Sequence, residues 1–176
     1  MKELSRKRAD IKTGFKCNNN CIFCVQAHKK KYGNRPGSDI KKDLDAAKAN
    51  GCIGVILTGG EVTIRDDVLE IVSYANRLGF EIIQIQTNGR RFFYKDFCRK
   101  MMKAVANEFA VAIHGQNAEV HDGLTRAKGS FEQTVAGIRN LKSMGVPVII
   151  NSVVVKQNYK YAEETAKLLV RLKVDQ

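Results

Sequence analysis

Short apolar runs alternate with helical patterns along almost the whole chain. Five apolar runs have the length of strands and cover residues 11–15, 52–57, 81–86, 109–113 and 147–155. Apolar positions spaced three and four residues apart predict helices at residues 39–50, 66–78, 94–105 and 130–144, with a last helix after Asn158. Ser130 and Gln133 predict a capping box at the start of the fourth helix, and the segment before it is predicted to be a long loop.

Five strand-then-helix units in a row predict an α/β fold with a parallel sheet. Polar segments follow the first four strands: a cysteine-rich loop, Gly59-Gly60-Glu61, Thr87-Asn88-Gly89 and His114-Gly115. Ligand sites of parallel α/β folds lie at the carboxyl edge of the sheet, so a site is expected there. A dinucleotide-binding sheet is disfavoured, because no G-x-G-x-x-G follows the first strand.

Composition predicts one domain over residues 1–176, since 44% of the residues are hydrophobic and no linker or repeat interrupts them. No stretch approaches the roughly 20 apolar residues of a membrane helix, so no membrane partner is expected. The basic N-terminus lacks the apolar run of a secretory signal. Three of the five cysteines crowd into one loop, which favours metal ligation in a reducing cytoplasm over disulfides. Cys52 and Cys98 are interpreted as buried small hydrophobes.

The formal net charge is +12, with basic runs at Arg6-Lys7-Arg8, Lys29-Lys30-Lys31 and Arg90-Arg91. One interpretation is an RNA, nucleotide or acidic-peptide partner. The other interpretation is that the basic residues lie on solvated loops and helix faces and bind no partner. We favour solvated faces, because aromatic residues are not interleaved with the basic ones in the manner of a nucleic-acid motif.

The run CNNNCIFC places Cys17, Cys21 and Cys24 in one short loop. Iron–sulfur clusters are normally held by four cysteines, so three thiolates leave one iron of a four-iron cluster open to a small molecule. The alternative is a structural zinc site with His28 as fourth ligand. The cluster is favoured for two reasons. The chain has enough apolar residues to fold without a structural zinc ion, and Gly59-Gly60-Glu61 follows the cysteine loop at the end of the second predicted strand.

The C-x3-C-x2-C spacing, with Phe23 before the last cysteine, resembles the cluster loop of the radical S-adenosylmethionine (radical SAM) superfamily. Gly59-Gly60-Glu61 resembles that family's second motif, although Val62 follows it where many members have proline. The resemblance spans roughly residues 10 to 174. It implies a partial TIM-like barrel of six β/α units, of which five are present, and we expect the sixth to be missing. In the natural protein a sixth strand would cover residues 148–155, an apolar edge that otherwise promotes association.

The resemblance also implies the cofactors and their ligands. The three loop cysteines would hold a [4Fe-4S] cluster whose open iron is chelated by S-adenosylmethionine (SAM). The Gly-Gly-Glu motif would bind the amino group of SAM, and Arg126, in the segment HDGLTRAKGSF, looks like the arginine that pairs with the SAM carboxylate. That segment resembles the branch with sulfatase-maturating and peptide-modifying members. Further expected cofactor contacts are Phe23, Asn88, His114 and Asn151.

The activity implied is reductive cleavage of SAM to methionine and a 5′-deoxyadenosyl radical, which takes a hydrogen atom from a substrate. A peptide or protein substrate is favoured, with a ferredoxin or flavodoxin as electron donor. RNA or nucleotide modification is the alternative within enzymes, and nucleic acid stays possible as a partner because of the basic charge. A non-catalytic iron–sulfur or zinc-binding protein is the alternative outside enzymes.

Overall fold

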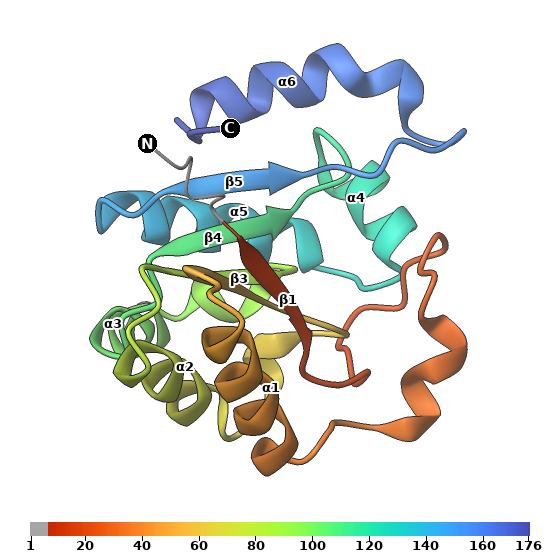
Figure 1. The fold of residues 1–176 in the computed structure, drawn as a ribbon. Helices are drawn as coiled ribbons and strands as arrows, with labels where there is room; N and C mark the ends of the chain where they lie inside the picture. The colour runs from red at the N-terminus through yellow and green to blue at the C-terminus, as the bar shows by residue number, and fades with distance from the viewer. Residues whose placement is uncertain (1–6) are drawn as a thin grey trace.

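Five parallel strands form one sheet in the order β1-β2-β3-β4-β5, which is also their order along the chain (Figure 1). This computed structural model describes residues 7–176. The strands are Arg8–Lys12 (β1), Gly54–Thr58 (β2), Ile82–Thr87 (β3), Glu108–Ala112 (β4) and Val148–Asn151 (β5). The helices between and after them are Gly37–Ala49 (α1), Val68–Arg77 (α2), Lys95–Lys103 (α3), Ala118–Thr125 (α4), Ser130–Ser143 (α5) and Ala162–Arg171 (α6). The predicted α/β class and its five strand–helix units are confirmed.

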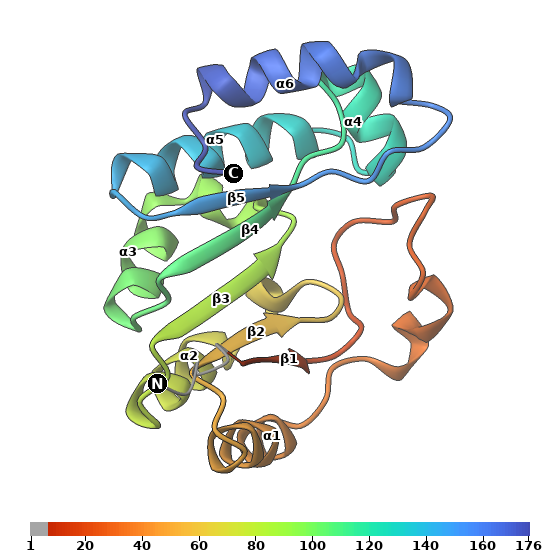
Figure 2. The same cartoon turned by 45° about the horizontal axis from the view of Figure 1, so that its top comes forward.

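The two faces of the sheet differ in chemistry because successive strand residues point to opposite faces. Val55, Leu57, Ile83 and Ile85 of β2 and β3 are buried in the core formed with the helices. The alternate residues face the other side and include the polar Thr58, Gln84 and Gln86, with Ile56 as an apolar exception. In Figure 2 the strand arrows point the same way, toward the red-to-orange segment that follows β1.

The sheet is strongly curved, as a partial barrel requires. Arg8 Nη1 of β1 lies 2.6 Å from Glu108 Oε1 of β4, although β2 and β3 separate the two strands. Gln84 of β3 donates to the same carboxylate oxygen at 2.5 Å. These side chains therefore meet across a concave polar face, while the helices cover the convex one.

β1 ends three residues before the predicted strand does, because the chain leaves the ladder after Lys12 and Gly14 bridges to Asn34 instead. β5 ends at Asn151, four residues before the predicted strand end. The reason is that the Val153 N–H donates to the His114 imidazole and not to a neighbouring strand.

The sequence interpretation missed α4, which lies in the segment predicted as a loop. Asn117 caps this helix by accepting from the Val120 N–H at 3.0 Å. The predicted capping box of α5 was wrong, because Gly129 precedes the helix and the Ser130 hydroxyl donates to Asp122. The Asp122 carboxylate also accepts from the Gly129 and Phe131 N–H groups, so a residue of α4 caps α5.

The edge beside β5 is partly covered. The Asp175 N–H donates to the Val148 carbonyl at 2.9 Å, and the Ile150 N–H donates to the Gln176 carbonyl at 2.7 Å. Farther along, Val153 and Val154 are 41% and 65% exposed. Association through this edge stays a prediction, as does a sixth unit.

Cys98 is buried, as predicted, and Cys52 is half-buried against the core. Arg6 of the first basic run lies outside the described residues. Within the described part of the chain, no helix combines the length and apolar character needed to cross a membrane.

Helix α5 packs directly on the turn that follows β3. A Cβ at Gly137 would lie 2.4 Å from the Gly89 carbonyl oxygen and 3.1 Å from Phe92 Cβ. Phe92 belongs to the short helix Arg90–Phe93 (η3) and is fully buried. Any side chain at Gly137 would push the helix away from this turn.

We expect Gly137→Ala to lower the free energy of unfolding by about 1–3 kcal/mol, because overpacking against a backbone carbonyl outweighs the better helix propensity of alanine. Gly123→Ala in α4 is the matched control, since a Cβ there meets nothing within 4 Å. The control should be neutral or stabilising by up to about 1 kcal/mol. Urea titration of both variants measures the difference, and equal midpoints would contradict the packing argument.

Candidate functional site

A cavity of about 540 Å³ opens at the carboxyl ends of the strands. Its lining comes from all five strands and from the segment after β1. It includes ten of the side chains or glycines predicted from the sequence as site residues: Cys17, Cys21, Phe23, Cys24, Gly59, Gly60, Glu61, Asn88, His114 and Asn151. Residues spread over most of the chain therefore meet in one place.

Backbone hydrogen bonds join the exit of β1 to the Gly-Gly-Glu turn after β2. The Gly60 N–H donates to the Gly14 carbonyl and the Glu61 N–H to the Lys16 carbonyl, each at 2.8 Å. A Cβ at Gly60 would lie 2.1 Å from the Lys16 oxygen, and one at Gly59 would lie 2.4 Å from the Gly14 oxygen. The glycines are thus required by the close approach of the protein's own backbone, in addition to lining the cavity.

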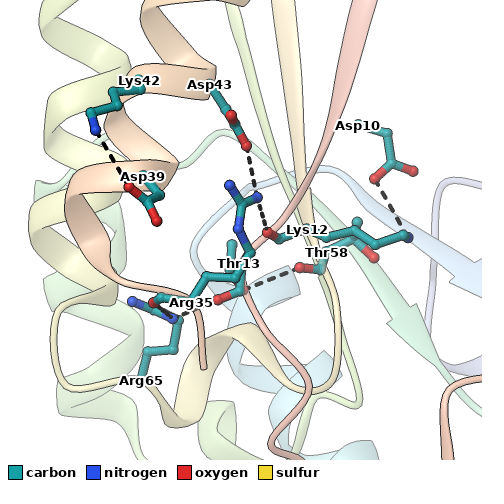
Figure 3. Close-up of polar contacts among 9 residues, drawn as sticks. All are labelled: Asp10, Lys12, Thr13, Arg35, Asp39, Lys42, Asp43, Thr58 and Arg65. Carbon is teal, nitrogen blue, oxygen red and sulfur yellow. Dashed lines mark hydrogen bonds and ion pairs between the residues drawn. The ribbon is translucent and has the colours of Figure 1, made fainter. Parts of the chain in front are cut away.

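Two arginines fix the end of β1 just before the cysteine segment (Figure 3). Arg65, which is only 4% exposed, donates to the Thr13 carbonyl at 2.5 Å and to the Arg35 carbonyl at 3.0 Å. Its charge is balanced by Asp67 at 2.7 Å. Arg35 in turn donates to the Lys12 carbonyl at 2.8 Å. Bonds from guanidinium groups are stronger than neutral ones, so this strand end is held firmly.

The Glu61 carboxylate is 2% exposed and accepts four hydrogen bonds from the protein. Its Oε1 accepts from the Thr63 N–H at 3.0 Å and from the hydroxyls of Thr63 and Thr87, each at 2.6 Å. Its Oε2 accepts from the Asn88 N–H at 2.6 Å. Glu61 therefore ties the turn after β2 to the turn after β3, and Oε2 keeps room for one more donor.

The turn after β3 holds the cysteine loop from one side. The Asn88 amide donates to Asn18 Oδ1 at 2.6 Å. Arg90 donates to the Asn18 carbonyl at 2.6 Å and to Asn19 Oδ1 at 2.8 Å, while its Nε donates to Gln133 of α5 at 2.7 Å. Asn18 and Asn19 are thus fixed by the turn after β3, and Gln133 of α5 supports that turn.

Helix α4 and the short helix Ala27–Tyr32 (η1) hold the same loop from other sides. The Asn20 and Ile22 N–H groups donate to the Thr125 and Leu124 carbonyls at 2.8 and 2.9 Å. Lys30 of η1 donates to the Asn19 carbonyl at 2.6 Å. The loop is therefore ordered by the surrounding chain.

The three loop thiols are free, half-buried and close enough to repel one another when ionised. Burial raises the pKa of Cys21 to about 11, with repulsion from Cys17 and Cys24 adding to it. Burial also raises the pKa of Cys17, partly offset by the Asn19 N–H that donates to its sulfur at 3.4 Å. Thiolates in this place need a cation to compensate their charge, and an iron–sulfur cluster is a group that would supply it.

A single-ion site is not formed by these groups. Within residues 7–176, no set of three or more His, Cys, Asp or Glu side chains is arranged to hold one metal ion. His28, the fourth ligand of the zinc alternative, is exposed on η1. A cluster distributes its thiolates over different irons, so the donor set fits a cluster better than tetrahedral zinc.

His114 forms the wall of the cavity beside β4, and the buried His121 stacks behind it. The rings of His114 and His121 lie 5.7 Å apart at 12°, and the Phe23 ring meets His114 edge-on at 4.7 Å. Burial lowers the pKa of both histidines to about 4. Both rings are therefore neutral at physiological pH.

Arg126 follows α4 in the left-handed conformation, with φ of 51°, and its exposed side chain does not line the cavity. Its pairing with a SAM carboxylate stays a prediction. Sequence reasoning missed the polar residues of the concave face that do line the cavity: Asp10, Lys12, Thr58 and Gln86. The alternation of polar and apolar residues in RADIK and IIQIQT was the signal that could have found them.

Comparison with known proteins agrees with this geometry. The model of the Radical SAM superfamily matches residues 11–169. The chain is 33% identical over 158 residues to an AdoMet-dependent heme synthase of Methanosarcina barkeri, covering 89% of this chain and 45% of that protein. It is 30% identical over 162 residues to a protein of Saccharolobus solfataricus described as a probable GTP 3′,8-cyclase, covering 91% and 52%. The chain thus spans about half of the length of these relatives.

Solved structures share the fold. SuiB of Streptococcus suis bound to S-adenosylmethionine superposes with a TM-score of 0.78 at 21% identity, over 96% of this chain and 37% of that one. Methylornithine synthase (PylB) gives a TM-score of 0.75 at 20% identity, over 96% and 51%. The predicted incomplete barrel is therefore an arrangement that solved structures contain.

Replacing Glu61 with glutamine tests its place at the junction of the turns. The amide nitrogen of Glu61→Gln must face a donor, because both carboxylate oxygens accept from N–H or O–H groups. We expect the free energy of unfolding to fall by about 2–3 kcal/mol. Glu81→Gln, at an exposed residue, is the control and should change stability by less than about 0.5 kcal/mol. Calorimetric unfolding of both variants measures this difference. An unchanged free energy of unfolding in Glu61→Gln would show that the hydrogen bonds of the Glu61 carboxylate do not stabilise the fold.

The histidine pair predicts a pH dependence of folding. The pKa values of His114 and His121 are lowered to about 4, so on acidification the unfolded chain binds protons first. Stability is then fully present above the ordinary histidine pKa and falls as the pH drops below it. Between pH 7.5 and 5.5 the loss should be about 1.3 kcal/mol per histidine. Denaturant titrations of the wild type and of His114→Gln at several pH values measure this loss. In the variant, the free energy of unfolding should depend on pH about half as steeply as in the wild type.

Proposed function

The chain belongs to the radical SAM superfamily, and on that premise we propose that it is the core of an enzyme that cleaves SAM reductively. Members of the family bind a [4Fe-4S] cluster and SAM. In this proposal Cys17, Cys21 and Cys24 hold the cluster, and SAM occupies the cavity at the carboxyl edge of the sheet. When bound, the cluster supplies the electron that breaks a carbon–sulfur bond of SAM.

One observation carries the proposal: the cysteine loop and the Gly-Gly-Glu turn share one cavity and are joined through their backbones. The Glu61 N–H donates to the carbonyl of Lys16, the residue before Cys17. The two motifs are therefore held in a fixed relation before any ligand binds, which is the preorganisation a two-part cofactor site needs.

The chain's own residues position and shield the ligand. Oε2 of Glu61 accepts one bond from the Asn88 N–H and has capacity for the SAM ammonium group. Asn88 and Asn151 line the cavity with further polar groups, and Phe23 with His114 forms an aromatic wall that excludes water.

The substrate is proposed to be a peptide or protein, with a ferredoxin or flavodoxin as electron donor. Structural similarity to SuiB, which has been solved with its precursor peptide SuiA, supports a peptide. A nucleotide is the second candidate. It is favoured by relatives described as probable GTP 3′,8-cyclases and by Lys12, a cation on the concave face of the cavity.

Anaerobic reconstitution with iron and sulfide tests the cluster. We expect four irons per chain in the wild type, and loss of the cluster in Cys17→Ala, Cys21→Ala and Cys24→Ala, because each thiolate holds a different iron. Cys52→Ala, at a half-buried cysteine outside the cavity lining, is the matched control and should keep full iron content.

Release of 5′-deoxyadenosine from SAM under a strong reductant then separates an enzyme from a cofactor-binding protein. Stoichiometric zinc without iron–sulfur absorption would contradict the cluster. A full cluster without deoxyadenosine would contradict the proposed activity alone.

A further inference from the structure

Lys30 differs from the other two lysines of its basic run. It is half-buried and lines the cavity, whereas Lys29 and Lys31 are exposed. Its ammonium group donates to the Asn19 carbonyl at 2.6 Å and to Asn20 Oδ1 at 3.2 Å. The charge of Lys30 is therefore held at the loop between the first two cysteines.

The hydrogen bonds of Lys30 place its charge without cancelling it, because both acceptors are neutral. Among residues 7–176, no carboxylate forms an ion pair with Lys30. The nearby thiols respond to the charge. Burial raises the pKa of both Cys17 and Cys21, and the Lys30 charge counteracts that rise at each of them. Lys30 thus favours negative charge in the cysteine loop.

This position matters for electron transfer. Reduction adds one electron, and with it one negative charge, to a cluster whose cysteine ligands are already anionic. The net charge around an iron–sulfur cluster is one of the factors that set its reduction potential. A cation held beside the loop favours the more negative, reduced state. Because Lys30 is half-buried, water and salt screen its charge less than they screen an exposed lysine.

We propose that Lys30 is a fixed cation that raises the reduction potential of the cluster held by Cys17, Cys21 and Cys24. The inference rests on the proposed function for the presence of that cluster. The electron comes from the ferredoxin or flavodoxin donor of the same proposal, and the transfer forms and breaks no bond. Lys30 acts here through its charge, separately from the two hydrogen bonds by which it orders the loop.

Anaerobic redox titration of the reconstituted protein, followed by the paramagnetic resonance signal of the reduced cluster, tests this role of the charge. Lys30→Met and Lys30→Gln remove the charge, whereas Lys30→Arg keeps it. We expect both neutral variants to disfavour reduction about tenfold, which is about 59 mV for a one-electron couple. Lys30→Arg should stay within about threefold of the wild type.

Lys31→Gln is the matched control. It removes the same charge from the same short helix, but the Lys31 ammonium group lies over the Tyr32 ring, 5.2 Å from its centroid, and is exposed to solvent. We expect it to change the reduction equilibrium by less than about threefold, because water screens an exposed charge. A shift in Lys31→Gln as large as in Lys30→Gln would show that total charge, and not the place of Lys30, sets the potential.

Iron content is measured first, so that potentials are compared between proteins with a full cluster. Neutral Lys30 variants with the wild-type potential would overturn the proposal. An equal shift, or an equal loss of iron, in Lys30→Arg and Lys30→Met would also overturn it, because the shape of the loop would then matter and not the charge. Absence of a cluster from the wild type would refute the proposed function, and this inference with it.

Discussion

A carboxylate withdrawn from water is stable only where the chain supplies donors to replace its hydration, and Glu61 draws those donors from two different turns. Thr63 lies beside it in sequence, whereas Thr87 and Asn88 belong to the turn after β3. The cost of burying the charge is offset only when both turns are in place. The turns after β2 and β3 are therefore expected to fold cooperatively. The cysteine loop depends on them through the hydrogen bond from Asn88 to Asn18.

The arrangement also explains why the loop needs so many partners. Three thiols held near one another repel when ionised, and burial increases that cost. Left without support, such a loop would open toward water. Arg90, Lys30 and the carbonyls at the end of α4 hold its backbone instead. The geometry of the loop is thus maintained by hydrogen bonds to its own backbone.

Most of the fold was predictable, because strand and helix positions follow from local apolar patterns. The errors arose where tertiary contacts override local signals. Ser130 has the sequence context of a helix cap, yet its hydroxyl donates a hydrogen bond to Asp122 of another helix. The cysteines and Glu61 could be placed because their motifs are contiguous in sequence. Lys12 and Gln86 could not, since their meeting depends on strand order and register. For Arg126, the sequence holds no signal that shows whether the side chain lies at an exposed helix end or in the wall of the cavity.

The alternation of faces along each strand separates two sets of constraints. Residues on the convex side, such as Leu57 and Ile85, are fully buried and must fit the helices. Those on the concave side, such as Asp10, Lys12 and Gln86, contribute little to that packing. Substitutions can therefore accumulate on the inner face at small cost to folding, while the turns at the edge keep their chemistry. A scaffold built in this way can acquire new substrates through inner-face changes alone, and its capacity to diversify is a direct product of the two-residue period of its strands.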